Sequence, residues 1–124
     1  MKTVGIIGGL GPETTAKFYL ELVNRCGKID LTNRPPILIW NVPVNKVEED
    51  KLLLQAEAGK TFLPLLVNSA QRLEKSGADF LIMPCNSLHF FIKEIKESVG
   101  IPVLNIIERT VAEIKSQDIK RVGY

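Results

Sequence analysis

The sequence predicts an α/β fold, a three-layer sandwich around a mainly parallel sheet. Short, mainly apolar segments, such as 3–7, 37–40 and 79–83, alternate with longer segments whose apolar residues recur every three or four positions. The short runs are typical of parallel strands, which are covered on both faces, and the longer spacing is typical of amphipathic helices. Such alternation produces right-handed crossovers. We expect the strand order second, first, third, fourth.

Bulk properties exclude several classes of partner. At 124 residues the chain has the length of one domain, with 16 basic and 14 acidic residues and a net charge of +2. No basic cluster of the kind that binds nucleic acid is present. No apolar run approaches the ~20 residues of a membrane span, and the amino terminus has no signal-peptide pattern. We therefore expect no nucleic acid or membrane partner and a cytoplasmic location.

The first strand, 3–7, leads into a glycine-rich turn and a helix. Pro12 suits the first helical position, and Gly27 is expected to end the helix just after Cys26. Its apolar face is predicted to contain Thr15, Phe18, Tyr19, Leu22 and Cys26.

The glycine-rich turn is a candidate anion site. Backbone amides around Gly9, Leu10, Gly11 and Pro12 could hold a carboxylate or phosphate at the helix start. A dinucleotide is disfavoured, because Thr14 replaces the third glycine of G-x-G-x-x-G and the second strand ends without an acidic residue. A tight turn needed only for packing is the open alternative.

The remaining elements follow in the same alternation. The second strand ends at Asn41, and residues 42–54 are predicted to be a surface connection or, alternatively, a mobile flap. A helix is expected over about 58–76, with Pro64 marking a start or kink near 61–63 and Gly77 ending it. Its apolar positions are Leu63, Leu66, Val67, Ala70 and Leu73. We then expect a strand at 79–83, a helix to about 98, a strand at 101–105 and a helix at 108–116.

Cys85 is the main catalytic candidate. It follows a buried strand and precedes Asn86 and Ser87 at an expected helix start, where helix amides lower a thiol pKa. The carboxyl ends of the strands would bring it to the same sheet edge as Asn41 and the glycine-rich turn. An amide and a hydroxyl beside the thiol could hold a carboxylate for proton transfer. A buried, inert cysteine is the alternative.

The other titratable candidates receive structural interpretations. Cys26 is expected to be a small buried hydrophobe on its helix, and His89 a partly buried structural histidine, with a polar lid or a partner of the site as its alternative role. Two cysteines and one histidine, with no C-x-x-C pair, do not make a typical zinc site. We predict no metal and no disulfide.

Four segments together resemble the aspartate racemases of the aspartate/glutamate racemase superfamily. They are residues 6–15, 77–80, 84–89 and 101–108, which include the glycine-rich turn and Pro84-Cys85-Asn86-Ser87-Leu88-His89. The resemblance implies a cofactor-independent enzyme of two similar domains with one catalytic cysteine from each. It implies that Cys85 is one of this pair, acting on a small-molecule amino acid, with aspartate the first choice.

The resemblance also assigns substrate-binding residues. Asn41, Asn86, Ser87 and the turn Gly9, Leu10, Gly11 and Pro12 would hold substrate carboxylates. Ser87 stands where the family usually has threonine, which keeps the hydroxyl. The loop 43–49 has no arginine, although many members carry one there.

The end of the chain predicts a repeat. Residues 120–124 echo residues 2–6, so we expect an α/β domain over 1–116 and the start of a second copy over 117–124. A chain with one of two thiols should be inactive alone, and its uncovered inter-domain face should make it a homo-oligomer. The alternatives are a one-cysteine decarboxylase or isomerase of the superfamily, or a non-catalytic module that binds acidic metabolites.

Overall fold

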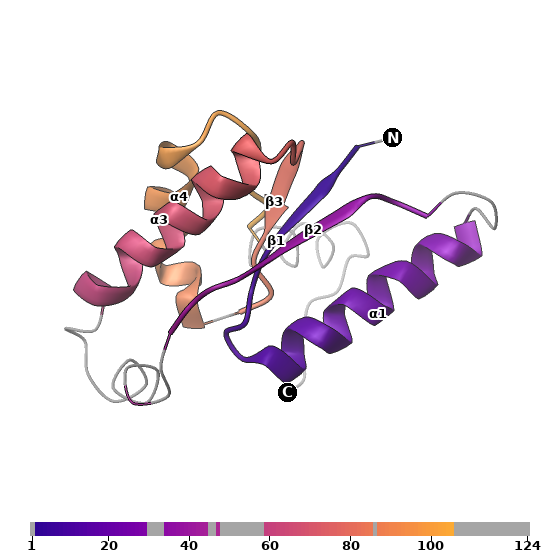
Figure 1. The fold of residues 1–124 in the computed structure, drawn as a ribbon, viewed down its shortest axis with the longest axis horizontal. Helices are drawn as coiled ribbons and strands as arrows, with labels where there is room; N and C mark the ends of the chain where they lie inside the picture. Colours follow the sequence, from indigo (N-terminus) through magenta and orange to yellow (C-terminus); the bar gives the residue numbers. More distant parts are fainter. Residues whose placement is uncertain (1, 30–33, 45–46, 48–58, 86, 106–124) are drawn as a thin grey trace, which may run out of the picture.

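The computed structural model describes residues 2–29, 34–44, 47, 59–85 and 87–105. Strands and helices alternate along these residues, which confirms the predicted α/β class (Figure 1). The elements are β1 (Val4–Gly8), α1 (Pro12–Ile29), β2 (Ile37–Asn41), α3 (Gly59–Lys75), β3 (Phe80–Ile82), the 3₁₀ turn η2 (Ser87–Phe91) and α4 (Ile92–Ser98).

The three strands form a parallel sheet in the order β2-β1-β3. Beyond β3, Val103 makes a single parallel bridge with Leu81. The Leu81 N–H donates to the Pro102 carbonyl at 2.8 Å, and the Leu104 N–H donates to the Leu81 carbonyl at 2.9 Å. The predicted strand order is therefore confirmed, but the predicted strand at 101–105 is reduced to a bridge, because β3 is short and Pro102 has no N–H to donate.

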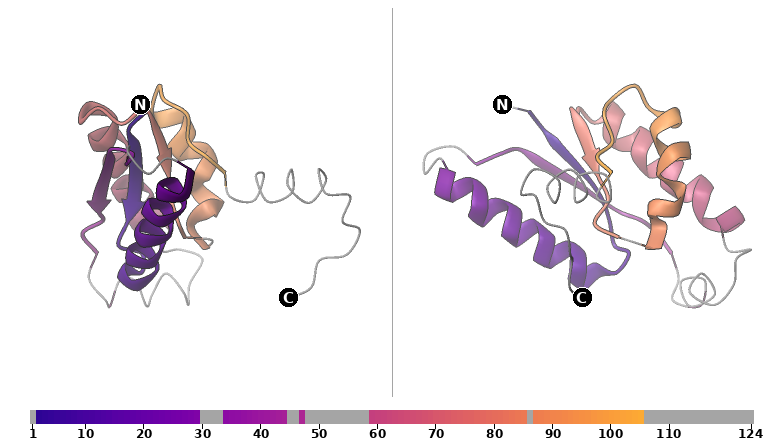
Figure 2. Two further views of the ribbon diagram at one scale, coloured as in Figure 1. Left: turned by 90° about the vertical axis from the view of Figure 1, so that its right-hand side faces the viewer. Right: turned by 180° about the vertical axis from the view of Figure 1, so that it is seen from behind.

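The helices lie on both faces of the sheet. α1 covers one side, while α3 and α4 lie against each other on the opposite side (Figures 1 and 2). The connection through α1 runs from the central strand to β2, and the connection through α3 runs back across the sheet to β3. Right-handed crossovers in opposite directions place their helices on opposite faces, which accounts for the layers.

The main core fills the space between the sheet and the α3–α4 layer. It joins residues of the strands and their ends, Ile7, Val42, Leu81 and Met83, to residues of the helical layer, Phe62, Leu66, Ala70, Leu73, Leu88 and Ile95. The buried face of α3 is shifted from the predicted one. Phe62 is fully buried, whereas Leu63 and Val67 are only half-buried. Positions 62, 66, 69, 70 and 73 share this face at helical spacing.

α1 differs from its predicted end and from its predicted burial. It continues to Ile29, so Gly27 lies inside the helix and does not end it. Thr15 is buried, but Cys26 is only half-buried and Tyr19 is 38% exposed. The prediction of a buried Cys26 is therefore wrong, since the helix is longer than the five-residue strands beneath it.

α3 has the predicted range and is ended by the predicted glycine. Gly77 has φ of 102° and directly follows the last turn, where the Ala78 N–H donates to the Leu73 carbonyl at 3.1 Å, as in a Schellman cap. The helix spans Gly59–Lys75, in agreement with the predicted range of about 58–76, and Pro64 lies inside it and does not mark its start. Proline removes a single helix hydrogen bond there, and Pro64 lies on the exposed side of the helix.

Several predictions fall outside the described residues. They concern the helix at 108–116, the repeat over 117–124 and most of the connection between Val44 and Gly59.

Candidate functional site

The carboxyl edge of the parallel sheet brings the predicted site residues together. Gly8 pairs with Asn41 across β1 and β2, and Ile6 pairs with Ile82 across β1 and β3. If the β1–β3 pairing is continued two residues beyond Ile6 and Ile82, Pro84 lies level with Gly8. Asn41 and the Cys85 turn therefore flank the glycine-rich turn, separated by two strand spacings, about 10 Å. This is a suitable width for a small substrate.

Gly9 occupies a position that strongly favours glycine. Its φ is 91°, in the left-handed region, and an added Cβ would collide with the Asn41 side chain. The Val42 N–H donates to the Gly8 carbonyl at 2.9 Å, which continues the β1–β2 pairing past the end of both strands. The predicted contact between the glycine-rich turn and Asn41 is thereby confirmed. Val42, predicted to lie in a surface loop, is buried.

Thr15 holds the glycine-rich turn from within α1. Its Oγ1 accepts a hydrogen bond from the Gly9 N–H at 2.9 Å and donates to the Gly11 carbonyl at 3.3 Å. Thr15 is 8% exposed, so both bonds are largely shielded from water. The Gly9 amide is therefore engaged inside the protein, and the sequence interpretation of Thr15 as an apolar-face residue missed this role. A hydroxyl in the first helical turn after a glycine loop is the signal that could have indicated it.

The other residues of the turn differ in what they can offer a ligand. Leu10 is 6% exposed and its side chain packs in the core, so only its backbone can face a ligand. Gly11 is partly exposed, and Pro12 is the exposed first residue of α1. Pro12 has no N–H, which leaves the Leu10 and Gly11 amides as the groups suited to a carboxylate.

Cys85 sits in a tight turn after β3. Its N–H donates to the Met83 carbonyl at 2.9 Å, and its side chain is half-buried against the core. Met83 itself is fully buried, which anchors the start of the turn. The partial exposure fits the partly exposed cysteine that the sequence predicts.

His89 contacts the Cys85 turn directly. Its Nδ1 lies 2.7 Å from the Cys85 carbonyl oxygen, and the residue is only 4% exposed. His89 is buried more fully than the predicted partly buried histidine, and its ring bonds to the backbone of the residue that carries the candidate thiol. The i, i+4 spacing of cysteine and histidine was the available signal for this contact.

The expected helix start beside Cys85 is wrong. The chain first forms the five-residue turn η2 from Ser87, and α4 begins only at Ile92. The aligned helix amides invoked for Cys85 from the sequence therefore belong to a helix further along the chain. The predicted substrate contact of Asn86 falls outside the described residues.

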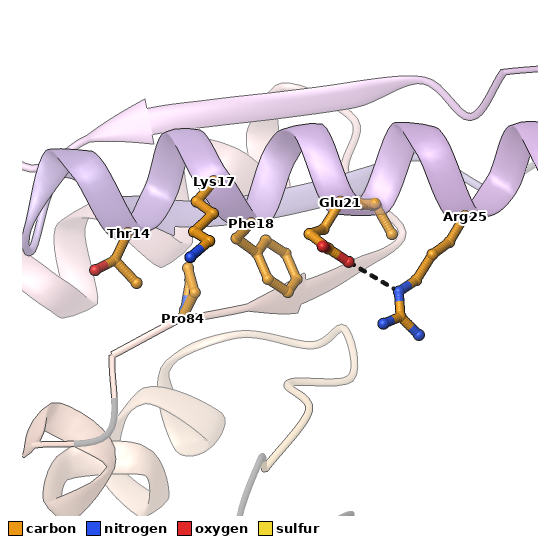
Figure 3. A pocket seen from close by; sticks show the side chains of 7 residues that line it. Thr14, Lys17, Phe18, Glu21, Arg25 and Pro84 are labelled. Carbon is orange, nitrogen blue, oxygen red and sulfur yellow. Dashed lines mark hydrogen bonds and ion pairs between the residues drawn. The ribbon is translucent and has the colours of Figure 1, made fainter.

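A groove of about 530 Å³ runs beside the site along α1. Figure 3 shows Thr14, Lys17, Phe18, Glu21 and Arg25 along one side of the helix, with Pro84 of the Cys85 turn beside Lys17. The Arg25 Nε donates to the Glu21 carboxylate at 3.0 Å. The groove therefore begins at the turn that carries the candidate thiol and extends away from it along the helix.

The described part of the chain has neither a cluster of metal ligands nor a membrane-spanning helix. No group of three or more His, Cys, Asp and Glu side chains in it could hold a metal ion. No helix there has the length and apolar character needed to cross a membrane.

Comparison with known proteins shows which family this chain resembles. The family model described as Asp/Glu/Hydantoin racemase matches residues 7–123. The broad specificity amino-acid racemase RacX of Bacillus subtilis is 30% identical over 115 residues, which cover 90% of this chain and 48% of that protein.

Solved structures agree with the sequence comparisons. A protein from Yersinia pestis, solved as a candidate Asp/Glu racemase, has a TM-score of 0.84 and 28% identity over 96% of this chain and 51% of its own. The aspartate racemase of Picrophilus torridus has a TM-score of 0.69 and 27% identity over 94% of this chain and 75% of its own. The chain thus spans about half the length of the curated relative it matches.

Proposed function

This chain belongs to the Asp/Glu/hydantoin racemase family, and from that membership we propose that it supplies the Cys85 side of a cofactor-independent amino-acid racemase. The observation that carries the proposal is the half-buried Cys85 thiol at the carboxyl edge of the sheet, across the glycine-rich turn from Asn41. Because the chain spans about half the length of RacX, the complete activity is proposed for the site that this chain forms with a second, cysteine-bearing half.

The proposed chemistry is transfer of the substrate's α-proton between two thiols. The Cys85 thiolate takes the proton from Cα, and the electron pair of the C–H bond remains on the substrate, delocalised into its carboxylate. A thiol on the opposite face then gives its own proton to Cα and becomes a thiolate. The configuration inverts, and no net electron or atom is gained.

Cys26 is unsuited to be the second thiol. α1 starts at the carboxyl edge of the sheet with Pro12, and Cys26 lies about 21 Å further along the helix axis at ~1.5 Å per residue. Pro84, next to Cys85, faces the first turns of the same helix. The second thiol is therefore expected from outside this chain, which should not racemise amino acids alone.

The proposed substrate is an acidic amino acid, with aspartate the first choice. The Asn41 side chain and the Leu10 and Gly11 amides are suited to hold a carboxylate beside Cys85, since all are hydrogen-bond donors at one sheet edge. Gly9 allows the tight turn, but its N–H does not face the substrate, because it donates to the Thr15 hydroxyl. Asn86 and Ser87 are proposed to add contacts on the Cys85 side.

Deuterium exchange at Cα tests the proposal on the chain itself. In D₂O, proton NMR should show loss of the α-proton signal from one aspartate enantiomer only, without inversion, because Cys85 reaches one face of the substrate. The C85A substitution should lower this exchange about a hundredfold or more. The matched substitution C26A should leave it unchanged.

These spectra, together with assays of CO₂ release and of Cys85 alkylation, separate the other functions. Equal exchange in wild type and C85A would overturn the proposed role of Cys85, and racemisation by the isolated chain would overturn the need for a second thiol. Release of CO₂ would identify a one-cysteine decarboxylase. Protection of Cys85 from iodoacetamide by aspartate, without any exchange, would identify a binding module.

A further inference from the structure

We propose that His89 is a positioning residue, which holds the backbone of Cys85 and so fixes the direction in which the thiol-bearing side chain leaves it. Its Nδ1 lies 2.7 Å from the Cys85 carbonyl oxygen. A carbonyl oxygen can only accept, so Nδ1 carries the proton of this hydrogen bond. The effect on the Cys85 side chain is argued from this contact, and only its consequence for proton transfer rests on the proposed function.

The bond completes a clamp on both peptide groups next to Cys85. On the amino-terminal side, the Cys85 N–H donates to the Met83 carbonyl at 2.9 Å. On the carboxyl-terminal side, the Cys85 carbonyl accepts from His89. With both flanking peptides held, rotation about the two backbone bonds of Cys85 is restricted. The Cα–Cβ bond therefore keeps one direction, and the thiol is limited to the staggered positions that rotation about this bond allows.

Burial makes this contact effective. His89 is 4% exposed and its neighbour Leu88 is 1% exposed, so water has little access to compete for the Cys85 carbonyl. The ring is carried by η2, whose residue Leu88 belongs to the main core. The clamp therefore connects the turn that carries the thiol to the main core. Thiol direction matters for the proposed reaction, because proton transfer requires the sulfur to point at Cα.

Three substitutions at His89 separate its hydrogen bond from its bulk. Asparagine places an N–H donor at nearly the position of Nδ1, whereas glutamine places its donor one bond further out, where Nε2 lies. Leucine keeps an apolar volume without a donor. The rate of Cys85 alkylation by iodoacetamide, followed by peptide mass spectrometry, reports on the thiol without requiring any racemase activity.

The expected results differ between these variants. H89L and H89Q should change the alkylation rate of Cys85 by about two- to tenfold, upward, because the loss of a net hydrogen bond of ordinary strength frees the turn. H89N should retain the wild-type rate. Cys26 in α1 is an internal control, and its alkylation should be the same in all four proteins.

A second control removes a comparable bond elsewhere. The Ser69 Oγ donates to the Leu65 carbonyl at 2.7 Å, also four residues earlier, and Ser69 is 1% exposed. S69A should lower the melting temperature as H89L does, yet leave Cys85 alkylation unchanged. A merely structural role for His89 predicts instead that S69A and H89L act alike on Cys85.

The outcomes that would overturn the proposal are specific. They are equal Cys85 alkylation in wild type, H89L and H89Q, a parallel rise at Cys26, or failure of H89N to retain the wild-type rate. None of them depends on deuterium exchange at the substrate. Failure of this positioning role and failure of the proposed racemase function are therefore distinguishable.

Discussion

At Gly9 the backbone adopts φ of 91° with the Asn41 side chain directly against its Cα. Both conditions require glycine, because a side chain in this conformation is strained and here would also strike its neighbour. Gly27 presents the opposite situation, since it lies inside α1 and an added Cβ would meet nothing within 4 Å. The backbone therefore requires glycine at position 9, in the candidate site, and does not require it at position 27.

Substituting these two glycines with alanine should change stability in opposite directions. G9A should lower the free energy of unfolding by about 1–3 kcal/mol through strain and displacement of Asn41. G27A should raise it by about 0.5–1 kcal/mol, because alanine favours the helix. Urea unfolding followed by the fluorescence of Trp40, the single tryptophan, measures both. A neutral G9A would contradict the assigned role of this turn.

At the scale of elements, α1 and α3 have similar lengths and different surroundings. α3 buries Phe62, Leu66 and Ala70 completely against the sheet and α4. α1 buries Thr15 at its first turns, while Leu20 is 58% exposed. The helix that starts at the candidate site is thus fixed mainly by its amino-terminal turns, through the bonds of Thr15 to the glycine-rich turn.

A pair of leucine truncations should show this difference. L66A should lower the free energy of unfolding by about 2–5 kcal/mol, because it leaves a cavity in the core between α3 and the sheet. L20A should change it by no more than about 0.5 kcal/mol, since that side chain is mostly in solvent and alanine suits a helix. The same urea titration compares them. Equal losses would show that α1 is covered as fully as α3.

At the scale of the whole molecule, large apolar side chains remain on the described surface. Phe90 is 84% exposed next to the Cys85 turn, and Ile39 of β2 is 43% exposed. Phe90 packs edge-to-face on Phe91, with ring centroids 5.3 Å apart, which holds its ring outward from the core. Phe90 therefore offers an exposed aromatic side chain beside the Cys85 turn, to which a second copy of the chain could bind.

We therefore expect the chain to form homo-oligomers. Sedimentation velocity should show a weight-average coefficient that rises with protein concentration, and F90S should weaken this association. Because Phe90 is so exposed, F90S should leave the urea midpoint of the monomer unchanged, which serves as the control. A single monomeric species at all concentrations would contradict the expectation.

Sequence alone determined the features that depend on local patterns. The apolar runs and helical spacings predicted the α/β class, and the carboxyl-edge rule for parallel strands predicted that Asn41 and the glycine-rich turn meet. The motif around Cys85 indicated the family that the comparisons show. These properties follow from periodicity and residue type, which neighbouring positions reveal without knowledge of distant contacts.

The tertiary structure decided between conformations and contacts that the local sequence allows equally well. Gly27 is compatible with either a helix stop or a helix interior, and the chain continues as helix to Ile29. The turn after Cys85 became 3₁₀ before α4, which local propensity did not distinguish from an α-helix. Thr15 and His89 bond to backbone groups only six and four residues away, but each side chain had other local options, and the folded structure selects these partners. Side-chain partners of this kind are set by packing, and packing is a property of the folded chain.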